Sequence, residues 1–522
     1  MVTNDLSLSK LTLWFPMVMN SMVSPSLKNF LDLNDKTSRL DFCIFRIQTE
    51  YDKDIAAAVN AEIEEYITER EAGETLADEE ATAKDAVYDR ESDKEPIVRI
   101  RLTTSDYDSE YHENVVLTCS QTFQLQTGEK AQIVTGGQTV TVNCNHPFFQ
   151  EGSIRVSTDS GILQIDSISH RNQINTYPGI LDLYLTEKGI LIVNELGMEE
   201  YVKRVVPSEM PASYGIEAAK LQSVCARTYA YQKLMAGQVD IYGAIANDST
   251  DYQVYNASLP KDISSQAADE TKGTVLVYDG SPMVPYYFST SCGFNTDNSV
   301  WSGTVLPYLR AQNLSYGENL NLQSEEVFRG FILNWDYPAY EDDCAWYRWN
   351  YTISLESLKT ILPERIASCI SEVPEKFRAV DPNGEVIAVD PAAVRNLERI
   401  QVTQRLKGGM VGEAALVCNQ ATIYVSGEMV LRRLLGCPER IYSNQSSEGM
   451  GESEGDYLPS AFFCLEDYTD ENGNRGYSIC GGGNGHGIGL SQNAAHAMLQ
   501  SGLTWGEVLQ FFYLGTSLVE IY

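Results

Sequence analysis

The stretch Val205-Val206-Pro207-Ser208-Glu209-Met210-Pro211 places one acidic residue between two prolines. Each proline fixes its own φ and disfavours the α region for the residue before it, here Val206 and Met210. The sequence therefore predicts that Glu209 is held on a stiff, extended turn. A long helical pattern follows, from Ile216 to Met235.

The polar residues of this predicted helix give a second signal. Lys220, Arg227 and Tyr231 are seven and four residues apart, so they share one helix face. A carboxylate at the mouth of a helix that carries two cations and a phenol in a stripe indicates one wall of a polar cleft. A solvated helix face explains the same pattern equally well.

Two later segments have polar residues at positions where sites are often built. The first is Tyr287-Phe288-Ser289-Thr290-Ser291-Cys292-Gly293-Phe294, in which hydroxyls follow a predicted strand. The second runs from Gly481 to Gln492 and holds His486 at the centre of a glycine-rich turn, where the backbone can approach another segment closely. This run lacks the Walker spacing and any basic residue, which argues against a nucleotide-phosphate loop.

Gln253 lies between these motifs in the context Thr-Asp-Tyr-Gln-Val-Tyr. Interleaved amide and aromatic side chains suit sugar recognition, because rings stack on CH faces and amides bond to hydroxyls. An exposed loop without a ligand is the alternative interpretation.

Three blocks in this order resemble the SpoIID/LytB family, the sporulation and amidase-enhancer proteins that act on bacterial peptidoglycan. They are VPSEMPASYGIEAAKLQSVCARTYAY (206–231), the 287–294 segment and the 481–492 segment. The resemblance covers about residues 96 to 522. It implies a lytic transglycosylase that cleaves the MurNAc–GlcNAc bond of peptide-stripped glycan strands, with Glu209 as the general acid/base. The residues expected to hold the glycan are Lys220, Arg227, Tyr231, Gln253, Ser289, Ser291 and His486.

The resemblance also implies a partner and a location. A cell-wall amidase is the expected partner, and the expected location is extracytoplasmic, in the cell envelope. In a spore former this is the space between the mother-cell and forespore membranes, where peripheral membrane association is conceivable. The alternative function is a non-catalytic amidase enhancer or glycan-binding module, because amidase-enhancer relatives are thought to act by binding.

Composition limits the other classes of function. The 522 residues carry a net charge of −34, which argues against nucleic-acid phosphate as a partner. The eleven cysteines include no CxxC pair, and the five histidines do not cluster with them. We therefore expect no metal site and no cofactor, and we interpret most of the cysteines as small buried apolar residues.

The chain divides into regions of different pattern. Residues 1–50 carry no clear period; the apolar-leaning stretch 11–23 is interpreted as a degraded signal, a mis-called start or a disordered tail. Residues 51–95 are predicted to be an acidic, disordered linker. Residues 96–195 show short alternating strands, and residues 196–522 mix helices with strands, with an elaboration at about 318–395. The predicted class is α+β, with a β-rich N-terminal subdomain and a long helix lining a glycan cleft.

Overall fold

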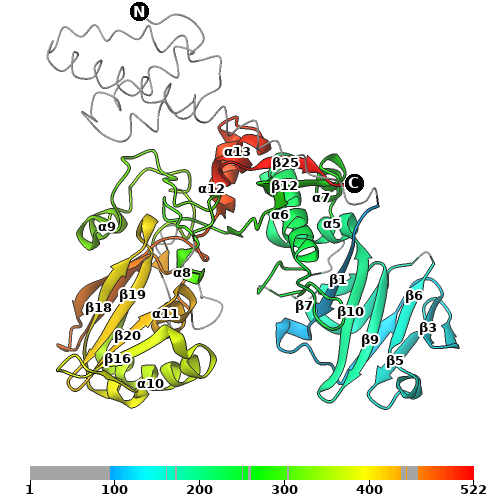
Figure 1. Cartoon of the computed structure of the whole chain (residues 1–522), viewed down its shortest axis with the longest axis horizontal. Coiled ribbons are helices and arrows are strands. Elements are labelled where there is room, and N and C mark those ends of the chain that lie inside the picture. Colours follow the sequence, from blue (N-terminus) through cyan, green and yellow to red (C-terminus); the bar gives the residue numbers. More distant parts are fainter. Residues whose placement is uncertain are drawn as a thin grey trace, which may run out of the picture. The chain divides into compact units, whose positions relative to one another are not determined.

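The computed structural model describes residues 94–159, 161–170, 173–249, 251–256, 260–302, 305–436, 442–443 and 457–522. The segment 1–50 and nearly all of the acidic stretch 51–95 lie outside these described residues. The described chain contains both helices and several sheets (Figure 1). The predicted α+β class is confirmed.

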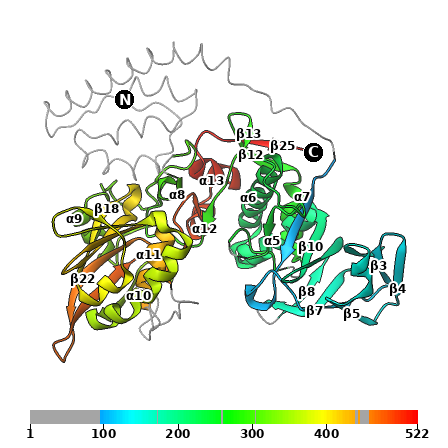
Figure 2. The same ribbon diagram turned by 60° about the horizontal axis from the view of Figure 1, so that its bottom comes forward.

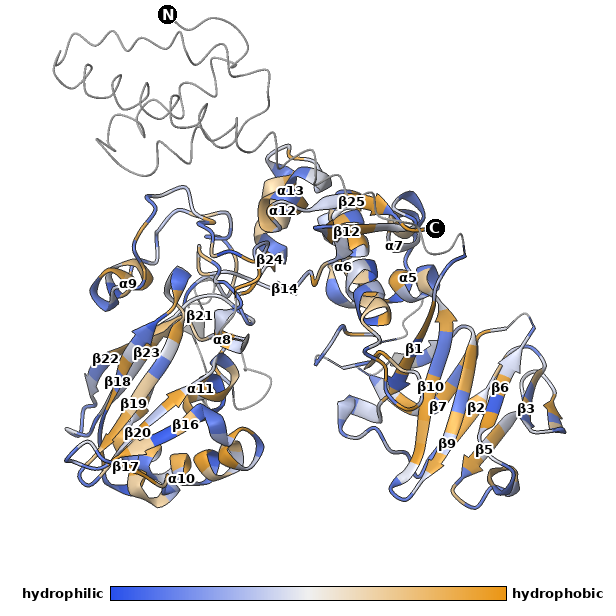
Figure 3. Cartoon of the chain, viewed as in Figure 1, coloured by the Kyte–Doolittle hydropathy of each residue, from blue (hydrophilic) through white to orange (hydrophobic). Residues whose placement is uncertain are grey.

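Two mostly antiparallel sheets form the first part of the described chain. Their strand orders are β11-β1-β10-β9-β6-β3-β4 and β5-β2-β7-β8. Val98, Ile100 and Leu102 alternate along β1 without exposed surface, in one core with the other strands. Figure 3 shows apolar residues along β9 and β10. The strands are β1 (Ile97–Leu102), β2 (Asn114–Thr118), β3 (Phe123–Thr127), β4 (Lys130–Val134), β5 (Thr139–Asn143), β6 (Ile154–Thr158), β7 (Leu163–His170), β8 (Gln173–Tyr177), β9 (Ile180–Thr186), β10 (Gly189–Gly197) and β11 (Ala246–Asn247).

Helix α5 (Met198–Glu209) continues directly from β10 and ends at Glu209. Pro207 lies inside this helix, whereas Met210 has the extended angles φ −121° and ψ 123°. The prediction of an extended turn is therefore correct for Met210 but wrong for Val206 and for Glu209 itself, which are both helical. Val206 is buried in the core that α5 shares with the sheets, and this packing outweighs the local effect of the following proline.

Helix α6 (Ile216–Met235) packs against α5 and α7 and against strand β12. The C-terminal segments return to the same region: β25 pairs with β12, and α12 and α13 contact α6. Figures 1 and 2 both show α13 beside α6. The elements around α6 are α7 (Asp262–Glu270), β12 (Thr274–Tyr278), β13 (Ser281–Pro282), β14 (Tyr287–Phe288), α8 (Ser299–Ser302), β24 (Leu490–Ser491), α12 (Gln492–Gln500), α13 (Trp505–Phe512) and β25 (Ser517–Glu520).

A further core, from Trp349 to Ile479, is formed by a segment that lies between α8 and β24 in the sequence. It is formed by sheets of order β17-β16-β20-β19-β18 and β21-β15-β23-β22, with two helices. The expected elaboration at 318–395 is thus only part of a longer unit. Its elements are β15 (Trp349–Ser354), α10 (Leu355–Glu372), β16 (Phe377–Val380), β17 (Val386–Ile387), β18 (Leu397–Arg405), β19 (Val411–Cys418), β20 (Thr422–Ser426), α11 (Glu428–Leu435), β21 (Tyr442–Ser443), β22 (Phe463–Thr469) and β23 (Arg475–Gly481), preceded by α9 (Glu325–Ile332).

Candidate functional site

The three motif segments meet in the folded chain. Strand β14 pairs in parallel with β24, which joins the 287–294 segment to the end of the glycine-rich run. The Gln492 amide Nε2 donates to the backbone oxygen of Glu209 at 3.0 Å. The last residue of α5 and the first residue of α12 are therefore tied together, although they are far apart in the sequence.

Glu209 is partly exposed and lies at the C-terminal end of α5. Its Oε1 accepts a hydrogen bond of 2.6 Å from the backbone N–H of Val254. A helix C-terminus carries partial negative charge, which opposes a second negative charge at the same place. The carboxylate is thus positioned by a backbone donor, and the residue remains partly exposed.

Gln253 is buried, with 1% of its surface exposed, and its amide joins three elements next to Glu209. Its Nε2 donates to the Tyr201 hydroxyl and to the Ala226 backbone oxygen, each at 3.3 Å. Its Oε1 accepts from the Tyr287 hydroxyl at 3.1 Å. Gln253 therefore holds α5, α6 and β14 together. The sequence predicted that its amide contacts a sugar, but the amide is used in these internal hydrogen bonds.

The Tyr287 side chain, which donates to Gln253, also lies near the Glu209 carboxylate. Burial, followed by the nearby charge of Glu209, raises the pKa of Tyr287 well above its usual value. Burial likewise raises the pKa of Tyr201. Both phenols therefore stay protonated in the neutral range; the Tyr287 hydroxyl donates to Gln253, and the Tyr201 hydroxyl accepts from it.

His486 holds the backbone of Tyr287. Its Nδ1 accepts from the Ile488 N–H at 3.1 Å, so the ring proton lies on Nε2, which donates to the Tyr287 carbonyl at 2.9 Å. Burial lowers the pKa of His486 to about 4. The imidazole is therefore neutral at physiological pH, and both of its nitrogens are engaged within the protein.

Ser291 and Ser491 both donate hydrogen bonds to Glu341, a residue that was not predicted from the sequence to belong to the site. The Ser291 N–H donates to Glu341 Oε1 at 2.8 Å, and the Ser291 hydroxyl donates to Oε2. The Ser491 hydroxyl donates to Oε1 at 2.6 Å. Ser291 is 2% exposed, so its hydroxyl serves this internal network, whereas Ser289 is partly exposed. No local pattern distinguishes Glu341 from the neighbouring acidic residues 342 and 343.

Glu341 makes the stability of the fold depend on pH. Burial raises its pKa from 4.5 to about 7. The folded state therefore holds a proton that the unfolded state releases, so this contribution is complete below pH 4.5 and is lost as pH rises through 7. We expect the free energy of unfolding, relative to Glu341→Gln, to fall by about 3 kcal/mol from pH 4.5 to 8. Denaturant titrations at several pH values measure it, and parallel profiles for the two proteins would contradict it.

The predicted stripe on α6 does not face Glu209. Lys220 pairs with Glu217 at 3.0 Å and with Glu270 of α7 at 2.8 Å. Arg227 has no exposed surface and pairs with the buried Glu199 at 2.6 Å. Tyr231 is 6% exposed and belongs to the core under the N-terminal sheets. This stripe is therefore part of a packed helix face, and the interpretation of it as one wall of a polar cleft is wrong.

The face of α6 that approaches Glu209 carries another set of polar and aromatic residues. They have the same spacing as the predicted stripe, and each lies two residues further along the chain. Gln222 accepts from the Gln492 amide at 3.2 Å. Tyr229 and Lys233 follow at intervals of seven and four, and the Lys233 ammonium lies 5.4 Å from the Tyr229 ring. A shift of two residues turns a helix by about 200°. Spacing alone therefore could not decide which polar stripe faces the site.

Four aromatic residues, here called the aromatic cluster, adjoin this face: Tyr229, Tyr252, Tyr286 and Trp301. Burial and the nearby phenols of Tyr286 and Tyr252 raise the pKa of Tyr229. Trp301 is 39% exposed and lies 4.9 Å from the Tyr286 ring, centroid to centroid. The Lys233 ammonium is 4.7 Å from the Tyr252 ring. The cluster thus presents exposed rings close to a cation and to the motif that contains Glu209.

Comparison with known proteins agrees with this arrangement. Residues 186–278, which include α5, α6 and the loop with Gln253, match the family model SpoIID, stage II sporulation protein. This segment of the chain is therefore similar to a SpoIID domain. The resemblance to the SpoIID/LytB family that the three motifs indicated is confirmed.

Two relatives illustrate the extent of this similarity. The amidase enhancer of Bacillus subtilis is 26% identical over 336 residues, which is 61% of this chain and 40% of that protein. The stage II sporulation protein D of Bacillus subtilis is 31% identical over 133 residues, which is 23% of this chain and 39% of that protein. The chain spans about two fifths of the length of each relative.

The glycine-rich run of the SpoIID-like chain approaches its neighbours too closely for a side chain. Gly489 has φ +76°, and a Cβ there would lie 2.2 Å from the Tyr286 carbonyl oxygen. This close approach allows β24 to pair with β14. The expectation of a tight turn that brings backbone against another segment is met at this residue.

We expect Gly489→Ala to lower the free energy of unfolding by about 2–5 kcal/mol, since left-handed strain and overpacking act together. Gly473→Ala is the matched control, because Gly473 also has a positive φ, +83°, but a Cβ there would meet nothing within 4 Å. The control should lose only about 1–2 kcal/mol. Urea denaturation compares the two variants, and equal losses would contradict the packing argument.

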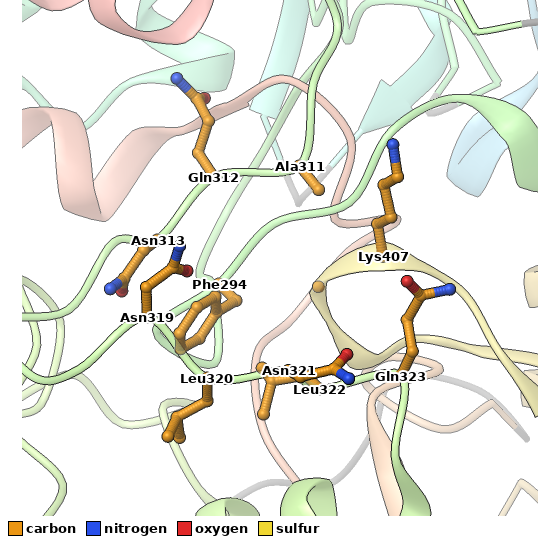
Figure 4. Close-up of a pocket in the computed structure, with 11 residues that line it drawn as sticks. Phe294, Ala311, Gln312, Asn313, Asn319, Leu320, Asn321, Leu322, Gln323 and Lys407 are labelled. Atoms are coloured by element: carbon orange, nitrogen blue, oxygen red, sulfur yellow. The ribbon is translucent and has the colours of Figure 1, made fainter. Parts of the chain in front are cut away.

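A separate hollow of about 250 Å³ lies beside the 294–323 segment of the SpoIID-like chain. Figure 4 shows Phe294 surrounded by amide side chains and Lys407. The hollow includes neither Glu209 nor the aromatic cluster, so it is distinct from the site. The amides that line it are Gln312, Asn313, Asn319, Asn321 and Gln323.

Within the described residues, no group of three or more histidine, cysteine or acidic side chains is arranged to hold a metal ion. None of the described helices combines the length and the apolarity needed to cross a membrane.

Proposed function

We propose that this chain is a lytic transglycosylase that acts on peptide-stripped peptidoglycan strands, with Glu209 as its general acid/base. The observation that carries the proposal is the position of Glu209. Its carboxylate is partly exposed where the three motif segments meet, and it accepts from the Val254 N–H at 2.6 Å. Because this donor fixes the carboxylate, it can be aimed at one bond of a bound glycan.

One carboxylate can serve both chemical steps. Glu209 protonates the oxygen that links MurNAc to GlcNAc, and the bond to the anomeric carbon breaks. Glu209 then accepts the proton of the MurNAc 6-hydroxyl as that oxygen bonds to the anomeric carbon. The product is a 1,6-anhydro end, no water is consumed, and the carboxyl group regains its proton.

The surroundings of Glu209 favour this mechanism over hydrolysis with two carboxylates. Glu341 contacts two of the motif segments, but it has no exposed surface and its oxygens accept bonds from Ser291 and Ser491. It therefore cannot reach a sugar or activate a water. Asp251, which is exposed on the loop that holds Val254, is the candidate for the second carboxylate of a hydrolytic mechanism.

We assign glycan contacts to the aromatic cluster, Lys233 and Ser289 in place of Lys220 and Arg227, which are engaged in ion pairs. Tyrosine and tryptophan faces stack on the apolar faces of sugar rings, and a neighbouring ammonium can bind the lactyl carboxylate of a peptide-stripped MurNAc. Trp301 is central to this assignment because it is the most exposed ring of the four.

We expect Trp301→Ala to weaken binding of peptide-free glycan about 2–10-fold, since one stacked ring contributes about 0.5–1.5 kcal/mol. Titration calorimetry with short strands measures the dissociation constant. Tyr468→Ala is the control, because Tyr468 is 36% exposed on β22, outside the cluster. An unchanged constant for Trp301→Ala would remove the cluster from the glycan site.

A second function, stimulation of a cell-wall amidase, is favoured by the alignment of 61% of this chain with a protein named amidase enhancer. The test is mass spectrometry of peptide-free strands after incubation with the full chain, alone and with a purified cell-wall amidase. New 1,6-anhydro ends without the amidase support the transglycosylase. Intact strands, together with faster amidase action, would assign the enhancer function. Both functions place the protein outside the cytoplasm, at the glycan strands.

A further inference from the structure

Cys464 on β22 and Cys480 on β23 lie directly opposite each other in an antiparallel pair of strands. Opposed residues in such a pair have Cα atoms about 4.5–5.5 Å apart and side chains on one face of the sheet. A disulfide needs a Cα separation of about 4.4–6.8 Å. Both cysteines are free thiols, and their side chains are hydrogen-bonded to each other. Among the described strands, no other two cysteines are opposed in this way.

The two thiols have different environments. Cys480 is partly exposed, and the hydrogen bond from Cys464 lowers the pKa of Cys480 to about 7. Ser478 Oγ lies 3.5 Å from the Cys480 sulfur. Cys464 has no exposed surface, and the shared hydrogen bond together with burial raises its pKa. Cys480 is therefore the attacking thiolate, and Cys464 is placed to resolve the bond that it forms.

We propose that Cys464 and Cys480 form a redox modification site that closes to a cross-strand disulfide when a small-molecule disulfide is present. The Cys480 thiolate attacks one sulfur of glutathione disulfide, whose S–S bond breaks and releases one glutathione thiolate. Cys464 then loses its proton to solvent and attacks the Cys480 sulfur of the mixed disulfide, which releases the second glutathione. Two protein thiols are oxidised, and one glutathione disulfide is reduced to two thiols.

The position of the pair gives the cross-link a structural consequence. Cys480 is followed by Gly481, so β23 leads directly into the glycine-rich run. The Gly482 N–H already bonds to the Phe462 carbonyl at 3.0 Å, just before Cys464. A disulfide would cross-link β22 and β23 where the glycine-rich run begins. It would also reduce the conformational entropy of the unfolded chain. The oxidised protein should therefore unfold at a higher temperature than the reduced protein.

The sequence offers a direct readout of the cross-link. Trypsin cuts after Arg440 and Arg475, which places Cys464 in the peptide 441–475 and Cys480 in the peptide 476–522. Each peptide contains one cysteine. The reduced full chain is incubated with glutathione disulfide, alkylated with iodoacetamide and digested without reductant. We expect mass spectrometry to find the two peptides joined and two hydrogens lighter, and scanning calorimetry to show a thermal midpoint a few degrees higher.

Two serine variants separate this pair from the other cysteines. Cys480→Ser should abolish the linked peptides and the rise in the midpoint. Cys418→Ser should keep both, because Cys418 lies opposite Leu397 on β18 and has no cysteine partner. Wild-type protein whose Cys464 and Cys480 stay fully alkylated, or carry separate glutathiones, would overturn the proposal. A linked pair with an unchanged midpoint would keep the modification site and overturn only its structural consequence.

Discussion

Replacing Glu209 by glutamine is expected to lower the rate of glycan cleavage by about 10²–10⁴-fold, the usual contribution of a positioned general acid or base. Glutamine keeps an oxygen that can accept the Val254 N–H, so the loop after α6 stays in place. The proton that must reach the leaving oxygen is lost. Initial rates of 1,6-anhydro end formation from peptide-free strands measure the effect.

Two acidic residues near Glu209 are the controls for this experiment. Glu217 lies in the first turn of α6 and is paired with Lys220 at 3.0 Å, so Glu217→Gln should cleave at the wild-type rate. Asp251→Asn tests the hydrolytic alternative, because Asp251 is exposed on the loop of Val254. A Glu209→Gln protein that still forms anhydro ends at the wild-type rate would refute the assignment of Glu209. Reducing ends that depend on Asp251 would indicate a two-carboxylate hydrolase.

A Glu209→Gln protein that loses cleavage but still stimulates an amidase would separate the two candidate functions. Stimulation needs a binding surface, whereas cleavage needs the proton of Glu209. Thermal midpoints of both proteins should agree within a degree or two, since the substitution preserves size and the accepting oxygen. A large drop in the midpoint would instead attribute the loss of activity to unfolding.

Local sequence signals were sufficient for several parts of this structure. The dipeptide Asp279-Gly280 is typical of a hairpin turn, and both residues have positive φ between β12 and β13. The sequence Asn472-Gly473-Asn474 is also typical of a turn between strands, and β22 pairs with β23 across it. These signals are short-range, because turn residues fix the geometry of the strands that they join.

The contacts of the site depend on packing that the sequence does not encode locally. The stripe of Lys220, Arg227 and Tyr231 has the same spacing as that of Gln222, Tyr229 and Lys233. The choice between the two faces is made by α7 and the N-terminal sheets, which cover the first stripe. Glu341 likewise comes from a segment that is distant in the sequence, so no local motif indicates that it contacts the site. The motifs located the site, and the tertiary contacts decided which side chains are exposed within it.

The buried pair of Arg227 and Glu199 is expected to give the largest loss of stability of any prediction made for this chain. Arg227 Nε and one terminal nitrogen donate to the two Glu199 oxygens at 2.9 and 2.6 Å. The guanidinium also donates to the Thr274 carbonyl at 3.1 Å. Arg227→Ala leaves a buried carboxylate without its cation, which costs about 3–5 kcal/mol. Guanidinium denaturation of the full chain measures the change.

Lys220→Ala on the same helix face is the matched control for Arg227→Ala. Both residues are cations that face α7, but the partners of Lys220 are 42–43% exposed at their side chains, and such pairs contribute at most about 1 kcal/mol. If Arg227 were a glycan ligand, its removal would weaken glycan binding and leave the unfolding curve unchanged. A loss of several kcal/mol for Arg227→Ala beside a small loss for Lys220→Ala would instead assign Arg227 to the core. Its role would then be to fix α6 against α5, and through them the position of Glu209.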